Sequence, residues 1–142
     1  MEHKISDDIR AKLTDIGLLI MRIWAGFVML WFHGKDKVFD FAERADSFPD
    51  PLGIGSSLSL ALAGGAEFFL SIFLIIGLFT RVIAIPLLFT MLVAAYAHAV
   101  AWGDPFSDYE LALFFATTYL MFIFTGPGKL SVDHLIAKQL SN

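Results

Sequence analysis

Residues 18–37 read LLIMRIWAGFVMLWFHGKDK, and this stretch decides the fold. It is apolar enough to enter a lipid bilayer, yet Arg22 lies inside it and His33 lies at its far end. A spanning helix needs about 20 predominantly apolar residues. A charge at the bilayer centre costs about 2.5–3.5 kcal/mol on insertion scales, so charged residues in such helices face a bundle interior. The stretch therefore predicts a membrane helix with one polar face.

The composition of the whole chain agrees with this prediction. The 142 residues are 57% hydrophobic and 17% charged, whereas soluble domains average about 45–50% apolar and about 25% charged residues. The chain has no cysteine, which excludes disulfides, thiolate metal sites and iron–sulfur clusters. Its net charge of −4 argues against a nucleic-acid partner. We therefore expect one integral membrane domain over residues 1–142, in contact with the lipid bilayer.

Apolar runs separated by Pro- and Gly-containing connections predict the transmembrane spans. The spans are expected at about 16–33, 58–79, 82–101 and 109–125. Helices are expected because every backbone polar group must be satisfied within the segment in lipid. The predicted fold is all-α: an integral membrane four-helix antiparallel bundle.

The segment before the first span predicts one more helix. Ile5, Ile9, Leu13 and Ile16 recur at helical spacing, which is typical of a short amphipathic N-terminal helix on the membrane surface. Basic residues predict the orientation, because they are enriched in cytoplasmic segments. With four spans, the side that holds both termini carries six of them: Lys4, Arg10, Lys12, Arg81, Lys129 and Lys138. Both termini are therefore expected on the cytoplasmic side.

The polar face of the first span is defined by spacing. Arg22, Gly26, Met29 and His33 are separated by 4, 3 and 4 residues, so they form one stripe that should face inward. Glu67 is the one acid expected near the depth of Arg22, which predicts an ion pair between the two residues. Such a pair could either fix helix packing or form part of a working site.

A second polar group is expected near the opposite membrane surface. His33, His98 and Glu110 all fall there if helices rise about 1.5 Å per residue. These residue types suit hydrogen bonding to a ligand and the transfer of protons. They also form a His/carboxylate set for zinc, iron or copper, although close ligand pairs such as HxxxH are absent. The simpler alternative places the histidines in the headgroup zone and Glu110 as a favourable acid in the first turn of a helix.

The order of the motifs resembles that of the DoxX family of small bacterial four-helix membrane proteins. The resemblance covers residues 16–135. It is carried by RxxxGF at 22–27, HGxxK at 33–37, GLxTR at 77–81, ELAL at 110–113 and GPGKLSVD at 126–133, together with Glu67 and His98. The family is similar to the small subunit of a thiosulfate:quinone oxidoreductase, whose acceptor is a membrane quinone.

The resemblance implies a quinone-linked oxidoreductase, or an accessory subunit of one, in the bacterial inner membrane. His33, His98, Glu110 and Glu67 are then the expected catalytic residues. Arg22, Gly26 and Lys37 are expected to hold the cofactor. Because the chain has no thiol and no recognisable haem or flavin motif, a redox role requires a quinone or a partner subunit. The alternatives are a metal-binding protein and a non-enzymatic anchor, chaperone or small-molecule carrier, either of which could be a homo-oligomer.

Overall fold

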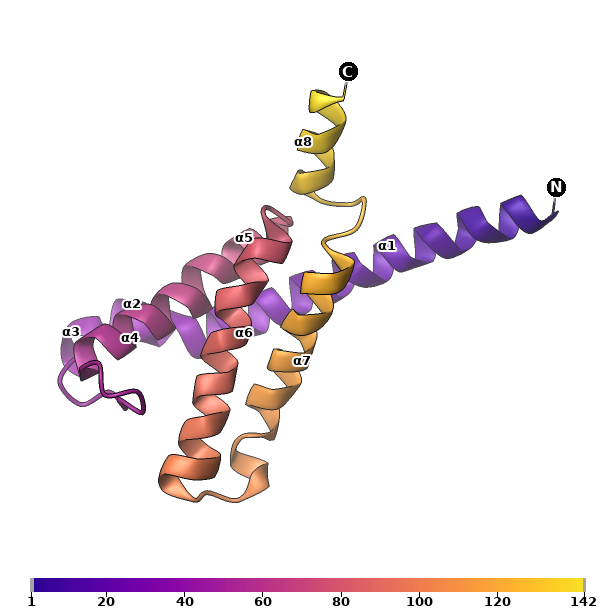
Figure 1. The fold of residues 1–142 in the computed structure, drawn as a ribbon. Helices are drawn as coiled ribbons and strands as arrows, with labels where there is room; N and C mark the ends of the chain where they lie inside the picture. Colours follow the sequence, from indigo (N-terminus) through magenta and orange to yellow (C-terminus); the bar gives the residue numbers. More distant parts are fainter. Residues whose placement is uncertain (1, 142) are drawn as a thin grey trace.

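The computed structural model of the chain describes residues 2–141, which form helices and connecting loops without a strand. The prediction of an all-α chain is confirmed. Two helical hairpins make up most of the chain (Figure 1). One hairpin pairs the first long helix with the segment 56–76, and the other pairs α6 (Thr80–Tyr96) with α7 (Glu110–Thr125).

The first long helix is longer than the predicted span. It consists of α1 (Glu2–Val28), the π-helical segment η1 (Met29–Gly34) and α2 (Lys35–Phe39). Residues 2–39 contain no proline, so nothing in the chain interrupts the backbone hydrogen bonds of this helix. The structure thus differs from the expected separate N-terminal helix, because the amphipathic residues 5–16 are the first turns of α1 itself.

The segment after the first helix returns along it. The short helix α3 (Phe41–Arg44) and a loop rich in Pro and Gly lead to α4 (Ser56–Gly64), η2 (Gly65–Leu70) and α5 (Ser71–Ile76). The Asp50 carboxylate fixes this loop by accepting hydrogen bonds from the Ile54 and Gly55 amides and from the Ser59 hydroxyl. α5 and η2 pack against α1 and η1, which completes the first hairpin.

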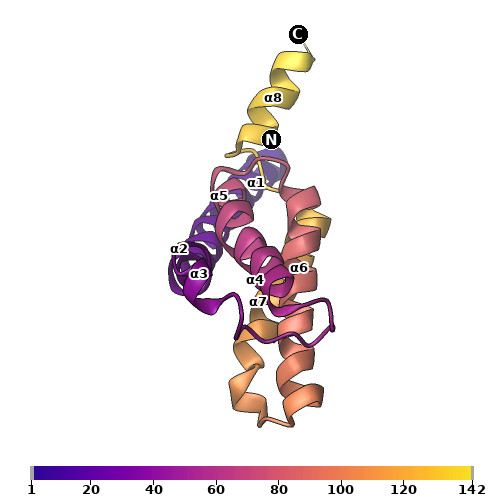
Figure 2. The ribbon, with the colours of Figure 1, turned by 90° about the vertical axis from the view of Figure 1, so that its left-hand side faces the viewer.

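A short turn joins the two hairpins. Gly77 ends α5 with φ +73°, a conformation that glycine adopts without the penalty of a Cβ atom. Helix α6 starts at Thr80 and continues as η3 (Ala97–Trp102). The short 3₁₀ helix η4 (Phe106–Asp108) then leads into α7, which packs along α6. The hairpins lie close at this turn and diverge toward the far ends of α2 and α6 (Figures 1 and 2).

The core lies where the hairpins meet. Leu74, Leu87, Tyr119 and Phe122 are fully buried there, and Met29 of the first helix joins them. The last helix, α8 (Val132–Leu140), projects beyond this core (Figure 1). Ser131 caps α8 by accepting a hydrogen bond from the His134 amide.

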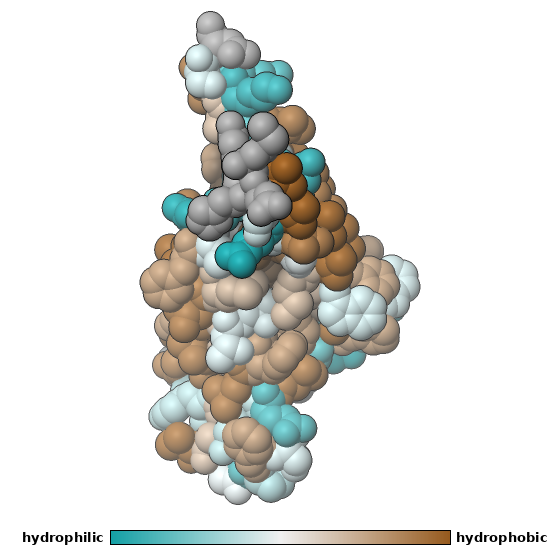
Figure 3. Space-filling view, turned by 90° about the vertical axis from the view of Figure 1, so that its right-hand side faces the viewer, coloured by the Kyte–Doolittle hydropathy of each residue, from teal (hydrophilic) through white to brown (hydrophobic). Residues whose placement is uncertain are grey.

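The outer surface of the described residues is that of a membrane protein. Three helical stretches are long and apolar enough to cross a bilayer: Ile5–Phe39, Ser56–Ile76 and Thr80–Trp102. Glu110–Thr125 is apolar but shorter. Large apolar side chains are exposed on each of these stretches, and they cover much of the face in Figure 3. Such a surface is stable against lipid and would be a liability in water.

Candidate functional site

Arg22 lies at the joined end of the hairpins, and Glu67 is not its partner. The Arg22 side chain is 1% exposed and donates to three backbone carbonyls, those of Ile75 (3.3 Å), Pro127 (2.6 Å) and Leu130 (2.8 Å). The predicted Arg22–Glu67 ion pair is therefore wrong. A guanidinium has five donors in a planar fork, and here helix-end and loop carbonyls satisfy three of them.

Two of the three carbonyl acceptors of Arg22, those of Pro127 and Leu130, belong to a segment that we call the C-terminal clasp, residues 126–133. The Asp133 carboxylate in this segment accepts hydrogen bonds from the amides of Phe79 (2.7 Å) and Thr80 (3.0 Å) at the start of α6. Asp15 of α1 accepts from the Lys129 amide at 2.8 Å. The GPGKLSVD motif thus ties together α1, the α5–α6 turn and α7, which is a structural role.

Two glycines bring the helices of the first hairpin close together. A Cβ atom on Gly26 would lie 2.6 Å from the Ile75 side chain, and one on Gly34 would lie 2.6 Å from backbone atoms of Glu67 and Phe68. Gly26, predicted to allow the approach of a backbone or a ligand, therefore accommodates α5. Gly34 lets the backbone of η2 touch η1, which places Glu67 beside the first helix.

Glu67 pairs with Lys37 across this contact. The Lys37 ammonium lies 2.5 Å from Glu67 Oε2 and also donates to the His33 carbonyl at 2.9 Å. The Glu67 side chain is only 6% exposed and that of Lys37 is 19% exposed. Because the first helix continues past Gly34, Lys37 lies one turn after His33 on the same helical surface. An ion pair at this burial needs both partners, since either charge alone would be costly.

This ion pair borders the main cavity of the described residues, which has a volume of about 560 Å³. The cavity lies between the diverging hairpins and is lined by residues of the first helix, the segment 48–67, α6 with η3, and the first turns of α7. Its lining is mostly apolar, and its basic and acidic groups come from His33, Lys37, Glu67, His98 and Asp108. An apolar cavity with a few convergent polar groups is the usual form of a small-molecule site.

His98 lines the cavity and pairs with Asp104, a contact that we did not predict from the sequence. Its Nδ1 atom lies 2.8 Å from Asp104 Oδ2, and its ring meets the edge of Trp102 at 4.8 Å between centroids. The carboxylate accepts, so Nδ1 carries the proton and Nε2 remains for another partner. Gly103, with φ +70°, turns the chain so that Asp104 folds back onto η3. This contact has no helical spacing, so periodicity could not predict it.

His33 faces the same cavity from the opposite hairpin. Its ring meets Phe115 of α7 edge-on, with 6.1 Å between centroids. The structure therefore brings His33, Lys37, Glu67 and His98 to one cavity and places Arg22 and Gly26 elsewhere.

Glu110 does not line the cavity. It is exposed in the first turn of α7, the position in which a helix dipole favours an acid. Among residues 5–141, no group of three or more His, Cys, Asp or Glu side chains could hold a metal ion. The proposed set of His33, His98 and Glu110 thus receives no support as a metal site, because the structure does not bring the three together.

Three of the polar residues that line the cavity share one backbone feature. The three π-helical segments among the described residues each contain one of them: His33 in η1, Glu67 in η2 and His98 in η3. A π segment adds a residue to a helical turn, and such segments occur frequently at functional sites. The wider turns redirect these side chains toward the cavity.

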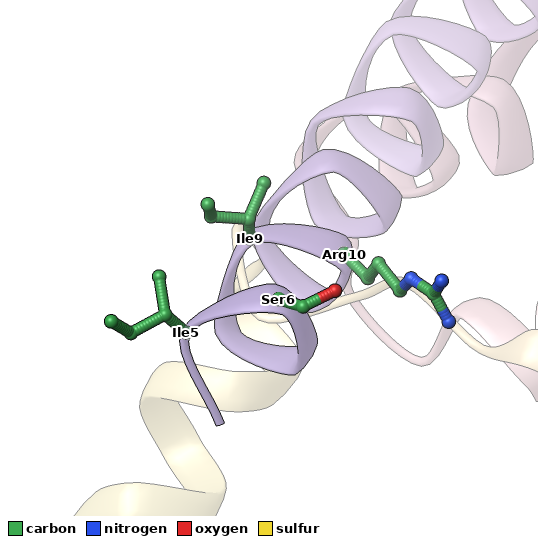
Figure 4. Close-up of a pocket in the computed structure, with 4 residues that line it drawn as sticks. All are labelled: Ile5, Ser6, Ile9 and Arg10. Carbon is green, nitrogen blue, oxygen red and sulfur yellow. The ribbon is translucent and has the colours of Figure 1, made fainter. Parts of the chain in front are cut away.

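A second hollow lies far from these groups, near the start of α1. It is lined by Ile5, Ser6, Ile9 and Arg10 (Figure 4). Both isoleucines are more than half exposed, and all four residues come from one face of a single helix. No charged groups from different elements converge there, so we regard the cavity between the hairpins as the candidate site.

Comparisons with known proteins identify the family of the chain. The DoxX family model matches residues 17–99, which is more than half of the chain. Two proteins of Haemophilus influenzae, each described as an uncharacterized protein, are 38% and 32% identical to this chain. The alignments cover 88% and 86% of this chain, and 86% and 92% of the relatives. No solved structure matches the chain significantly. The chain belongs to the DoxX family of membrane proteins.

Proposed function

We propose that the cavity binds the ring of a membrane quinone, and that the chain is a quinone-linked oxidoreductase or an accessory subunit of one. The proposal places the chain in the bacterial inner membrane with four spans and both termini in the cytoplasm. One observation carries it: polar groups on both hairpins, His98 on one and the Lys37–Glu67 pair on the other, border one apolar cavity. A para-quinone has a flat apolar ring with a carbonyl at each end, which suits this distribution of polarity.

The proposed chemistry assigns proton handling to the chain. Reduction of a quinone to a quinol takes two electrons and two protons. The electrons come from a partner subunit that carries an electron-transfer group, because this chain has no cysteine for a thiol or a cluster. As the imidazolium, with Nδ1–H donating to Asp104, His98 can donate a hydrogen bond from Nε2 to one carbonyl and give up that proton when the ring is reduced. Lys37 and Glu67 are positioned to serve the other carbonyl.

An accessory role is supported by the first turns of α1. This part of the helix projects away from the hairpins (Figure 1). Ile5, Ile9 and Leu13 on it are each more than half exposed. An apolar stripe on a projecting helix can pack against a partner subunit or lie on the membrane surface. Such a contact could serve a non-enzymatic anchor as well as a redox subunit.

Tryptophan fluorescence tests the proposal. Trp102 lines the cavity, so a variant with Trp24→Phe and Trp31→Phe leaves one reporter beside the site. Titration with a short-chain ubiquinone in detergent should quench this fluorescence to saturation. His98→Ala should raise the Kd about tenfold, which corresponds to the loss of roughly 1.4 kcal/mol from one hydrogen bond.

Two further variants define the control and the reading of the result. Asp104→Asn should raise the Kd less than His98→Ala, because it only loosens the orientation of the ring. Glu110→Gln is the matched control, since Glu110 lies outside the cavity. Quenching that does not saturate, or that is equal in the His98→Ala variant and the parent, would count against the quinone site.

A further inference from the structure

The cavity extends along α6 from its polar end to the middle of the helix. His98 and Trp102 line it near the end of η3, and Pro86 and Phe89 line it further along α6. At about 1.5 Å per residue, Phe89 lies roughly 14 Å from His98 along the helix axis. The cavity is therefore long in the direction of the α6 axis, with His98 and Trp102 toward one end.

The mid-helix end of the cavity is apolar and open to the outside. Leu62 of α4 and Phe89 of α6 both line the cavity, yet they are 57% and 59% exposed. Side chains that border both a cavity and the exterior mark an opening. Leu62 lies six residues into its helix, or roughly 9 Å from the end, and Phe89 lies deeper. With a hydrocarbon layer of about 30 Å, the exterior at these residues is lipid.

A loop lines the cavity next to the start of α4. Phe48, Pro51 and Leu52 of the connection between α3 and α4 line the cavity as well. Figure 2 shows this loop passing across the space between α3 and α6. The Asp50 carboxylate holds it through three hydrogen bonds. Leu52 of this loop and Trp102 near His98 are 48% and 49% exposed, so the cavity also borders the exterior on these sides.

We infer that the ligand is a lipid-soluble molecule with a long apolar tail that enters sideways from the bilayer. Its ring lies among His33, Glu67 and His98, and its tail leaves the cavity between Leu62 and Phe89. The inference rests on the proposed function for the identity of the ring. It adds that the tail belongs to the recognised part of the substrate, so a ring without a tail is a poor ligand.

The first measurement compares two ligands that differ only in the tail. The probes are 2,3-dimethoxy-5-methyl-1,4-benzoquinone and the same ring with a decyl chain, each titrated against the Trp102 reporter in micelles. The Kd is expressed as a mole fraction in the micelle, so that partitioning of the tail into detergent cancels. The decyl compound should bind at least tenfold more tightly, because tail methylenes contact the walls of the cavity.

The second measurement locates the tail. The chain has no native cysteine, so Leu62→Cys and Phe89→Cys can each carry one methanethiosulfonate spin label. Leu92→Cys is the matched control, since Leu92 is 47% exposed on the same helix without lining the cavity. The decyl compound should immobilise the label at residues 62 and 89 and leave the label at residue 92 unchanged. The tail-less ring should leave all three unchanged.

The outcomes separate the two proposals. Equal affinities for both compounds, with no change at residues 62 and 89, would overturn the sideways opening and leave the quinone site standing. Equal immobilisation at residue 92 would also overturn it, because the tail would then lie in the micelle. If neither compound binds, the proposed function fails and the inference fails with it. Two labelled positions keep the test valid should one variant not fold.

Discussion

Buried charged side chains have different kinds of partner at the two ends of the hairpins. At the joined end, Arg22 is surrounded by backbone carbonyls and lies away from the main cavity. At the diverging end, Lys37 and Glu67 pair with each other beside that cavity. The comparison teaches that a charge in a membrane helix indicates burial, whereas its function depends on whether space for a ligand lies next to it. The first site holds the hairpins together, and the second is available for chemistry.

The largest effect should follow from removing the charge at the joined end. Arg22→Met leaves the carbonyls of Ile75, Pro127 and Leu130 without their donor, and each unsatisfied buried group costs about 1–3 kcal/mol. We expect a loss of at least about 3 kcal/mol in the free energy of unfolding, measured by titration with sodium dodecyl sulfate in mixed micelles.

Arg81→Met is the matched control for this prediction. Arg81 is exposed and has one long hydrogen bond, to the Phe124 carbonyl at 3.3 Å, so its replacement should change stability little. If Arg22→Met kept the stability of the parent but weakened binding of the quinone ring, the proposed difference between the joined and the diverging ends would be wrong. Arg22 would then be part of the ligand site, as the sequence had suggested.

The next largest effect concerns the contact that positions Glu67. Gly34→Ala places a Cβ atom 2.6 Å from the backbone of η2, so the two helices must separate. Overpacking of this kind costs about 1–3 kcal/mol, and the shift should also weaken ring binding. Thermal melting and the Trp102 titration measure the two effects on the same sample. In contrast to Arg22→Met, this variant should therefore impair both stability and binding.

Gly65→Ala serves as the control for Gly34→Ala. A Cβ atom there meets nothing within 4 Å, and its backbone is helical with φ −59°. Its stability should equal or slightly exceed that of the parent, because alanine favours helix over glycine. Equal melting temperatures for Gly34→Ala and the parent would show that the hairpin does not depend on this close approach.

A smaller effect is expected at the ion pair itself. Glu67→Gln leaves the Lys37 ammonium without its counter-charge and should cost about 2 kcal/mol, less than the roughly 3–5 kcal/mol of a fully buried pair, because the Lys37 side chain is 19% exposed. The double variant Lys37→Met with Glu67→Gln should be more stable than the sum of the two single losses predicts, by about 1–2 kcal/mol. A double-mutant cycle on the free energy of unfolding measures this coupling. Strictly additive losses would show that the pair contributes no interaction energy.

The smallest effect involves the loop that lines the cavity. Hydrogen bonds from the Ser59 hydroxyl and then from the Gly55 amide lower the pKa of Asp50 from its ordinary value. A carboxyl with a lowered pKa stabilises the folded loop above its unfolded pKa of about 4 and loses this contribution as the pH falls further. Amide exchange at Ile54 and Gly55, corrected for intrinsic rates, should therefore speed up below about pH 4.

Asp50→Asn provides the reference for the pH experiment. Its side chain does not titrate, so corrected exchange at the two amides should not follow this pH profile. The same profile in the variant and the parent would assign the change to another group.

The helices could be predicted from the sequence because helix formation depends on residues that are close together along the chain. Apolar runs and Pro- or Gly-rich breaks indicated where helices lie, and the stripe of Arg22, Gly26 and Met29 is buried as expected. The N-terminal residues formed no separate helix because amphipathicity describes a face of a helix and does not mark an end. An end requires a breaker, and Gly17 alone did not supply one.

The partners of the buried charges could not be predicted in the same way. The donors of Arg22 go to backbone carbonyls, which every residue has and no sequence pattern marks. Lys37 was expected to hold the cofactor, but from a position after the end of the first predicted span. Its four-residue spacing from His33 was a signal that the helix continued and carried the ammonium toward Glu67.

The π-helical segments have a consequence for how the spans tolerate changes in length. Each segment holds one residue beyond the α-helical count, so deleting one residue there would restore a regular helix. Because the wide turn already absorbs the extra residue, the turns on either side would keep their rotational phase. A deletion in a regular α-helical part of the same span would instead turn the remainder of the helix by about 100° and rotate lipid-facing side chains toward the interior. Single-residue deletions should therefore be tolerated better at the π segments than elsewhere in these three spans.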